Sequence, residues 1–181
     1  ERVMEYHRMH TGISRFSKFK YWQEELLAKP YSNEIGAQLS ARFSAMVVDA
    51  VVSAPYVPGA IEFLEAHHRN LPLYVASGTP ESELKDIIRR RAMGSYFAAV
   101  RGAPAMKAEI LRDYIRCGPF QPNRVLMVGD ARADWVGACE AGTAFIGRAA
   151  NGCSDEFPPE TVVIADLRGL PSAINIVTGR T

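Results

Sequence analysis

The segment that most constrains the fold is an apolar run, residues 125–128, which ends abruptly at Gly129-Asp130 and is followed by a second carboxylate at Asp134. A short continuous apolar run is typical of a strand buried on both faces of a parallel sheet, and residues 135–141 have a helical pattern. Asp130 is therefore predicted to lie at the carboxyl end of a strand, with Asp134 in the first turn of the next helix. Open α/β sheets bind their ligands at that edge.

Two carboxylates at such an edge suit a hard cation. Mg²⁺ usually binds through one or two carboxylates together with a substrate phosphate, so Asp130 and Asp134 are predicted metal ligands. A purely structural interpretation is also open, because Asp is common in turns and at helix starts, where it caps free N–H groups and complements the helix dipole.

Helical and strand patterns alternate along residues 58–165, whereas residues 1–54 show only helical patterns. Alternation of this kind predicts parallel strands joined by right-handed crossovers, with helices on both faces of the sheet, which is a Rossmann-like α/β fold. We therefore expect a small all-helical subdomain at residues 1–54 and an α/β core at residues 55–181. The predicted helices are 1–10, 13–28, 33–52, 61–69, 81–92, 108–117 and 134–141, and the predicted strands are 73–76, 96–101, 124–128, 144–146 and 161–165.

Two other strand ends carry polar residues. Ser77-Gly78-Thr79 follows the predicted strand 73–76, and its hydroxyl and amides could hold an anion near the next helix start. The alternative is an N-cap turn in which Pro80 is the first helical residue. Lys107 precedes a helix between two predicted strands. A surface lysine is the default interpretation of any single Lys, and this position leaves an inward-reaching cation as the functional one.

Composition is that of a globular chain. With 181 residues, 48% hydrophobic and 23% charged, it can bury one core and a small subdomain. The net charge of +1 predicts no overall attraction to nucleic acid or membranes. Cys117, Cys139 and Cys153 are odd in number and lack metal-type spacing, which favours reduced thiols and a cytoplasmic location. We expect no apolar stretch to reach membrane-spanning length, and no signal peptide is recognisable.

The ordered set of Ser77, Lys107 and Gly129-Asp130-x-x-x-Asp134 resembles the second, third and fourth motifs of the haloacid dehalogenase (HAD) superfamily. The resemblance covers about residues 55–170. Within it, residues 56–60 are similar to the return from a helical cap into the core in the phosphoglycolate phosphatase and β-phosphoglucomutase branch. The resemblance thus implies a HAD core with residues 1–54 as its cap.

The resemblance also implies roles for the motif residues. Ser77 and Gly78 would hold the phosphoryl oxygens, and Ser77 and Lys107 would act in catalysis, Lys107 also by binding phosphate. Asp130 and Asp134 would hold the cofactor Mg²⁺. The implied reaction is hydrolysis of a small phosphorylated metabolite through an aspartyl-phosphate intermediate, with no nucleic-acid or membrane partner. The Gly-Asp-x-x-x-Asp form favours a phosphatase or phosphomutase over a metal-independent dehalogenase.

The predicted cap carries further candidates. A Gly-broken turn precedes Arg15 and Lys18, which are expected to face the core and hold an anionic substrate; an ordinary capped helix start is the alternative. Phosphonatases add a cap lysine that forms a Schiff base, which leaves Lys18 and Lys20 as candidates for that chemistry. His7 and His10 share a helical face, but they lack a further ligand pair and are interpreted as packing or surface residues.

One motif of the family is not found in residues 1–181. The first motif, an apolar strand ending in Asp-x-Asp, supplies the nucleophile, and the nearest candidate is Asp49, which lies in a predicted helix and is followed at the second position by Val51. We expect the nucleophile to lie in a stretch before Glu1. A non-catalytic HAD-like binding module is the alternative from another functional class. A receiver-like signalling domain, which also uses carboxylates and a lysine at strand ends, lacks the cap.

The missing motif leads to a structural expectation. In the HAD fold its strand lies between the strands that end at Ser77 and Asp130, so those two strands should not pair with each other directly. Either an upstream segment or another chain would fill the slot. In a third arrangement, residues 45–51 would leave their helix and carry Asp49 to the catalytic position.

Overall fold

The computed structural model describes residues 1–152 and 155–179, and its first part is helical. It contains α1 (Arg2–Met9), α2 (Arg15–Tyr21), a π-helical turn over Trp22–Leu26, and α3 (Asn33–Ser53). The side chains of Ser14 and Ser32 accept hydrogen bonds from the first-turn amides of α2 and α3, which stabilises both helix starts. The predicted helix at 13–28 is therefore shorter and ends in the π-helical turn. A domain boundary at residue 54 stays a prediction.

The remaining chain alternates helices and strands, and every strand pair is parallel. This confirms the predicted α/β class. The C-terminal helix was not predicted from the sequence, although its apolar residues follow helical spacing. The elements are α4 (Ala60–His67), β1 (Tyr74–Pro80), α5 (Glu81–Arg90), β2 (Ala99–Ala103), α6 (Lys107–Cys117), β3 (Leu126–Gly129), α7 (Arg132–Ala141), β4 (Ala144–Arg148), β5 (Val163–Ile164) and α8 (Leu170–Thr178).

The strands form two separate sheets, β1-β2 and β3-β4-β5. As expected, β1 and β3 do not pair, and no strand of the described residues lies between them. The third arrangement proposed for this slot is wrong, because residues 45–51 remain in α3. Asp49 is on the surface there, paired with Arg90 of α5 at 2.7 Å. Because Asp49 lies within a helix and its side chain is exposed, it does not stand at the end of a strand and is not the nucleophile.

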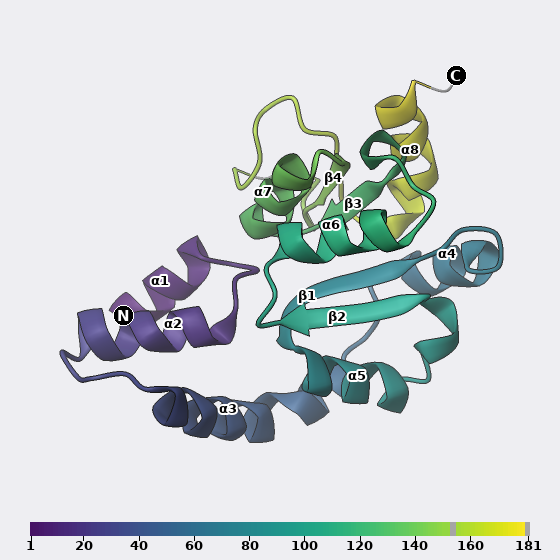
Figure 1. Cartoon of the computed structure of the whole chain (residues 1–181). Helices are drawn as coiled ribbons and strands as arrows, with labels where there is room; N and C mark the ends of the chain where they lie inside the picture. The colour runs from purple at the N-terminus through teal and green to yellow at the C-terminus, as the bar shows by residue number, and fades with distance from the viewer. Residues whose placement is uncertain (153–154, 180–181) are drawn as a thin grey trace.

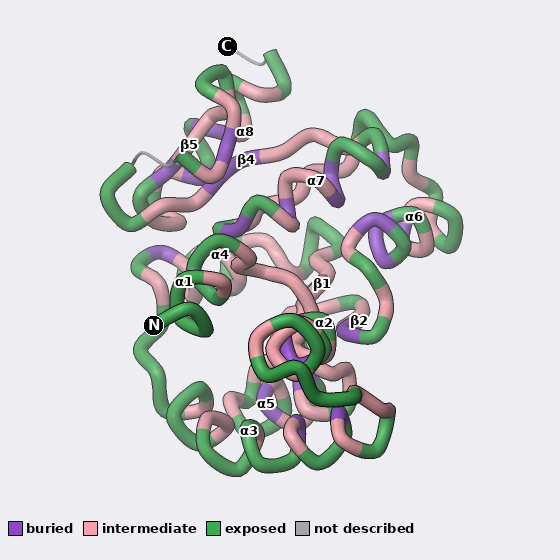
Figure 2. Tube along the Cα trace, turned by 90° about the vertical axis from the view of Figure 1, so that its left-hand side faces the viewer, coloured by how far each residue is buried: buried purple, intermediate pink, exposed green. Residues whose placement is uncertain are grey.

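Helices cover both sides of the sheets. The helices α6 and α7 pack against each other, α6 also contacting β1 and α7 contacting β3 and β4 (Figure 1). On the opposite sides, α5 contacts β1 and β2, and α8 contacts β4 and β5. The core cluster joins Ile146 of β4 to Ile164, Leu170 and Ala173, and Figure 2 shows further buried stretches on α5, α6 and α7.

The long helix α3 contradicts the expectation that no apolar stretch reaches membrane-spanning length. With 21 residues and a mean hydropathy of 1.3 in its most apolar window, α3 is by length and composition long and apolar enough to cross a membrane. Only 11% of that window is buried, and Met46 is 80% exposed. The helix packs against α2 and α5. The Ala- and Val-rich composition of α3 accounts for the difference.

The cysteines were expected to be reduced. Cys117 and Cys139 are exposed free thiols. Cys153, the third of the set, lies outside the described residues.

Candidate active site

Lys107, the first residue of α6, connects the two sheets. Its ammonium donates hydrogen bonds to the carboxylate of Asp134 on α7 and, at 2.9 Å, to the carbonyl of Ala76 on β1. The side chains of Lys107 and Asp134 are only 13% and 5% exposed. The carbonyl of Leu73, just before β1, accepts a hydrogen bond from the N–H of Ala98, just before β2, and therefore points toward β2. Because carbonyl directions alternate along a strand, that of Ala76 points to the edge of β1 that β2 leaves free.

Asp134 is held at both of its oxygens. One accepts from Lys107, and the other accepts from the backbone N–H of Ala131 at 3.2 Å. Gly129, the last residue of β3, lies directly against it: a Cβ built on Gly129 would stand 2.3 Å from the Cβ of Asp134. This contact explains why a glycine precedes Asp130 in the motif, since any larger residue would displace the buried carboxylate.

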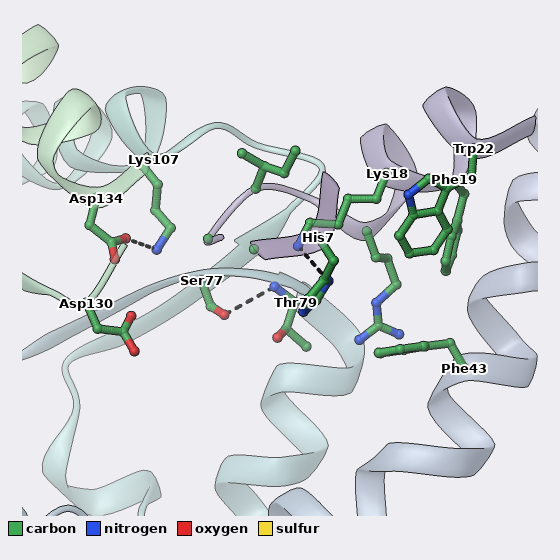
Figure 3. A pocket seen from close by; sticks show the side chains of 14 residues that line it. His7, Lys18, Phe19, Trp22, Phe43, Ser77, Thr79, Lys107, Asp130 and Asp134 are labelled. Atoms are coloured by element: carbon green, nitrogen blue, oxygen red, sulfur yellow. Dashed lines mark hydrogen bonds and ion pairs between the residues drawn. The ribbon is translucent and has the colours of Figure 1, made fainter. Parts of the chain in front are cut away.

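Asp130 differs from Asp134 in its surroundings. It follows β3 directly, is exposed, and makes no ion pair or hydrogen bond within the described part of the chain. Its carboxylate lines the same cavity as Lys107 and Asp134 (Figure 3). Among the described residues, no group of three or more His, Cys, Asp or Glu side chains is arranged so that it could hold a metal ion. One free and one engaged carboxylate fit Mg²⁺, which takes most of its remaining ligands from water and substrate phosphate.

The segment Ser77–Thr79 belongs to β1 itself, where the sequence placed it just after the strand. Pairing with β2 shifts register between Ala76 and Pro80, so Ser77 and its neighbours bulge out of the ladder. The hydroxyl of Ser77 accepts from the N–H of Thr79 at 3.1 Å. A Cβ on Gly78 would meet the carbonyl oxygen of Gly12 at 2.9 Å. The glycine thus allows the turn before α2 to lie directly on this bulge.

These residues share one cavity of about 290 Å³. The core contributes Ser77, Gly78, Thr79, Lys107, Asp130 and Asp134. We call the opposite wall the cap side; it is formed by His7, Gly12, Ile13, Arg15, Lys18, Phe19, Trp22 and Phe43. Figure 3 shows the two walls facing each other. The residues predicted to bind phosphate, metal and substrate therefore line one cavity, whereas the further candidates Lys20 and Asp49 lie outside it.

Arg15 lines the cavity, and the carboxylate of Glu83 balances its positive charge. Its guanidinium binds Glu83 of α5 through two hydrogen bonds, at 2.5 and 2.9 Å, and donates to Ser44 of α3 at 2.8 Å. The group also lies 4.8 Å from the ring centre of Phe43. Burial disfavours the ionised Glu83, but the hydrogen bonds from Arg15 and Ser44 outweigh it and lower the pKa of this carboxyl. Arg15 therefore ties the cap helices to the core.

Lys18 has no such partner. It is 7% exposed, and its ammonium contacts Nδ1 of His7 at 3.2 Å. No carboxylate pairs with it among the described residues. Burial lowers the pKa of Lys18, and burial together with the charge of Lys18 lowers the pKa of His7. The other cap candidates lie elsewhere: Lys20 is exposed outside the cavity wall, and His10 bonds the carbonyl of Tyr6 at 3.0 Å.

Sequence reasoning missed the aromatic part of the cap side. Phe19 and Trp22 lie three residues apart and pack together with ring centres 5.7 Å apart, and Phe43 of α3 packs on Phe19. Helical spacing would have placed Phe19 and Trp22 on one face, but not the direction of that face. Nε1 of Trp22 is buried and has no hydrogen-bond partner among the described residues.

Comparison with known proteins agrees with this geometry. A family model described as haloacid dehalogenase-like hydrolase matches residues 6–148. A phosphoglycolate phosphatase of Mannheimia succiniciproducens is 31% identical over 134 residues, which are 70% of this chain and 59% of that relative. This chain thus matches less than two thirds of the relative's length.

Solved structures show the same fold. A predicted phosphatase from Clostridium acetobutylicum has a TM-score of 0.73 at 16% identity, over 90% of this chain and 77% of that one. A predicted phosphoglycolate phosphatase from Haemophilus somnus gives a TM-score of 0.70 at 18% identity, over 95% of this chain and 80% of that one. With the cavity at the edge of a parallel sheet and the family match over most of its length, the chain belongs to the haloacid dehalogenase-like hydrolases.

Proposed function

We propose that this hydrolase is a phosphatase that releases phosphate from a small phosphorylated metabolite with the help of Mg²⁺. The observation that carries the proposal is the convergence of Lys107, Ser77 and the free carboxylate of Asp130 in one cavity. A cation, a hydroxyl and a hard-metal ligand are the groups that binding of a phosphoryl group requires. The phosphatase names of its relatives support the same activity.

The roles of the core residues follow from their contacts. The hydroxyl of Ser77 and the backbone amides of the bulge at Gly78 bind the phosphoryl oxygens. Lys107 offsets the negative charge that moves toward the attacking group. Asp134 holds Lys107 in place, because it accepts from the ammonium while the N–H of Ala131 fixes its other oxygen. Phosphoryl transfer depends mainly on such positioning and electrostatic stabilisation.

Asp130 and Asp134 are the residues that would hold Mg²⁺. When bound, the ion supplies positive charge that lets an anionic nucleophile approach an anionic phosphate. Asp130 is free to bind it directly. Asp134, whose carboxylate also accepts from Lys107, would be the second residue to hold the ion.

The identity of the attacking group as an aspartate is proposed only from the resemblance to the HAD superfamily. An aspartyl-phosphate route needs a nucleophilic carboxylate, and none of the residues that the structure describes occupies its place. We propose that it lies on a strand between β1 and β3, the slot that neither sheet fills. On the cap side, Lys18 contacts the substrate, and Arg15 positions the cap through Glu83. A cytoplasmic location and the lack of nucleic-acid or membrane partners stay predictions.

The test is phosphate release by the protein made from its complete reading frame, over a panel of small phosphate monoesters. We expect Mg²⁺-dependent turnover that chelator abolishes and that Asp130→Asn lowers by at least about a hundredfold. Asp49→Asn, a surface carboxylate substitution, is the matched control and should leave turnover unchanged. Undiminished activity in chelator would refute the metal role. Binding of phosphate without any turnover would favour a non-catalytic module.

A further inference from the structure

We infer that Glu156 is a positioning residue that fastens the turn between α1 and α2 to the core and thereby sets how long the cavity retains a phosphoryl group. This turn, residues 10–13, is called the cap turn below. The inference rests on the proposed function, because phosphate is the ligand that is retained. Glu156 itself lies in the loop after β4, outside the wall of the cavity.

One carboxylate oxygen of Glu156 joins two parts of the chain that are far apart in sequence. Oε2 accepts a hydrogen bond from the hydroxyl of Thr11, in the cap turn, at 3.3 Å. The same oxygen accepts from the backbone N–H of Arg132, the first residue of α7, at 3.2 Å. An anion at a helix N-terminus is also stabilised by the helix dipole. Glu156 therefore connects the cap turn to the helix that carries Asp134.

The neighbour of Glu156 fixes the loop from which this carboxylate extends. Phe157 is buried and packs on Phe145 of β4, with the ring centres 5.2 Å apart. Its ring also covers Gly147 of β4, where an added Cβ would stand 2.6 Å from the ring. Burial of an aromatic side chain is among the larger contributions to packing. The sheet thus holds Glu156 in reach of both donors.

The cap turn lies directly on the residues proposed to bind phosphate and metal. Gly12 has a left-handed φ of +72°, and a Cβ built on it would stand 2.6 Å from the Cβ of Ala131, which follows Asp130. On the other side, a Cβ on Gly78 would meet the carbonyl oxygens of Gly12 and Ile13 at 2.9 and 3.1 Å. Gly12 and Ile13 also line the cavity. The cap turn therefore bridges the bulge of β1 and the loop after β3.

Two polar contacts hold this part of the chain, and they act at different places. The ion pair of Arg15 with Glu83 holds the start of α2 on α5. The hydrogen bond of Thr11 to Glu156 holds the cap turn on α7. Loss of the second contact should therefore free the cap turn while α2 stays attached. A cap turn that lifts more often opens the cavity, so a bound phosphate should leave sooner.

The first measurement needs no ligand. Order parameters of the backbone amides of Gly12 and Ile13 are obtained by ¹⁵N relaxation in the protein from its complete reading frame. In the wild type we expect values near those of the helices, about 0.85, and in Glu156→Ala and Thr11→Val values below about 0.6. Glu160→Ala removes an exposed carboxylate of the same loop and is the matched control, with no change expected.

The second measurement follows inorganic phosphate. Its dissociation rate is measured by stopped-flow mixing with a fluorescent phosphate sensor. Glu156→Ala and Thr11→Val should each raise the rate about tenfold, as for the loss of a hydrogen bond to a charged group. The double variant should be no faster than Glu156→Ala, because both substitutions remove the same contact. With phosphate monoesters, KM should rise by a similar factor while kcat changes little.

Conservative variants separate positioning from a general loss of structure. Glu156→Gln keeps an oxygen acceptor and Thr11→Ser keeps the hydroxyl, so both should restore most of the slow dissociation. Thr11→Val is the more selective of the two disruptive variants, because it leaves the hydrogen bond from Arg132 to Glu156 in place.

The outcomes distinguish this inference from the proposed function. If phosphate binds and its dissociation rate is the same in the wild type, Glu156→Ala and Thr11→Val, the proposed function stands and the inference is refuted. Additive effects in the double variant refute it as well, since the two residues would then act separately. If the order parameters fall as expected but the wild type binds neither phosphate nor any phosphate ester, the proposed function fails, and the role of Glu156 in retention fails with it.

Discussion

Lys107 and Asp134 form a buried ion pair that joins the two sheets of the core. The lysine begins the helix after β2, and the aspartate lies in the helix after β3. Because the ammonium also binds the carbonyl of Ala76, one side chain connects β1 to the far sheet at the edge where β1 has no neighbouring strand. The same contact that is proposed to orient the phosphate ligand therefore also holds the fold together.

Lys107→Met should therefore lower stability as well as activity. Removing one partner of a buried pair leaves Asp134 uncompensated, and the free energy of unfolding should fall by about 3 kcal/mol. Urea denaturation followed by circular dichroism measures it. Lys85→Met breaks the exposed pair with Glu81 on α5 and serves as the control, with an expected change under about 0.5 kcal/mol. Equal effects of the two substitutions would contradict a structural role for Lys107.

Gly129→Ala should damage the site through packing. The added Cβ would stand 2.3 Å from the Cβ of Asp134, so the carboxylate must shift away from Lys107. We expect a loss of about 1–3 kcal/mol in unfolding free energy, as for overpacked cores, and a loss of phosphate binding. Gly94→Ala, where a Cβ meets nothing within 4 Å, is the matched control. Thermal denaturation and phosphate titration of both variants settle the point.

Glu83 should make the attachment of the cap to the core depend on pH. The folded state lowers the pKa of this carboxyl below its ordinary value of 4.5, through the hydrogen bonds from Arg15 and Ser44 that outweigh its burial. A lowered acid pKa contributes stability that is present above the unfolded value and is lost as pH falls through the folded one.

Arg15→Met removes the larger of the two hydrogen-bond contributions that lower this pKa, so that only the hydrogen bond from Ser44 still opposes the effect of burial. The variant should therefore lose stability relative to the wild type near neutral pH, and the difference should shrink as pH falls below 4.5. Unfolding free energies between pH 3 and pH 7 measure the difference. Arg89→Met, at an exposed pair with Asp86, provides the comparison. A difference that stays constant across this range would show that the ion pair contributes nothing.

Lys18→Met should stabilise the ligand-free protein. Burial lowers the pKa of Lys18 below its ordinary value of 10.5, so the unfolded chain binds the proton more tightly. That group contributes instability at neutral pH, which diminishes as pH rises toward 10.5. We expect a gain of about 1 kcal/mol at pH 7, measured by urea denaturation, against no change for Lys20→Met. A loss of stability would mean that the contact with His7 outweighs burial.

Much of the fold was readable from the sequence because its signals are local. Apolar runs located the strands, and the serine caps that the structure shows at the starts of α2 and α3 are local signals of the same kind. The convergence of Ser77, Lys107 and Asp130 followed from one rule of parallel sheets, which brings the carboxyl ends of strands to one edge. The length of β1 was underestimated, since the bulge at Ser77 depends on how it pairs with β2.

The parts that escaped prediction depend on long-range contacts. The charge of Arg15 is matched by Glu83, 68 residues away, and nothing in the local sequence of either indicates the pair. Helical spacing likewise could not show that Trp22 faces the cavity, because the direction of that face is set by packing on Phe43 of α3. The ion pair between Asp134 and Lys107 could not be predicted either, because these residues lie 27 positions apart in the sequence.

The division of the strands into two sheets has a consequence for how the molecule opens. Backbone hydrogen bonds connect β1 to β2, β3 to β4, and β4 to β5, but within the described part of the chain none joins the two groups. Between them, cohesion comes from the packing of α6 on α7 and from the ammonium of Lys107. Cooperative unfolding units tend to follow such boundaries. Amide protons of β1 and β2 should then exchange with solvent as one group and those of β3 and β4 as another, until a strand that pairs with both merges them into a single cooperative unit.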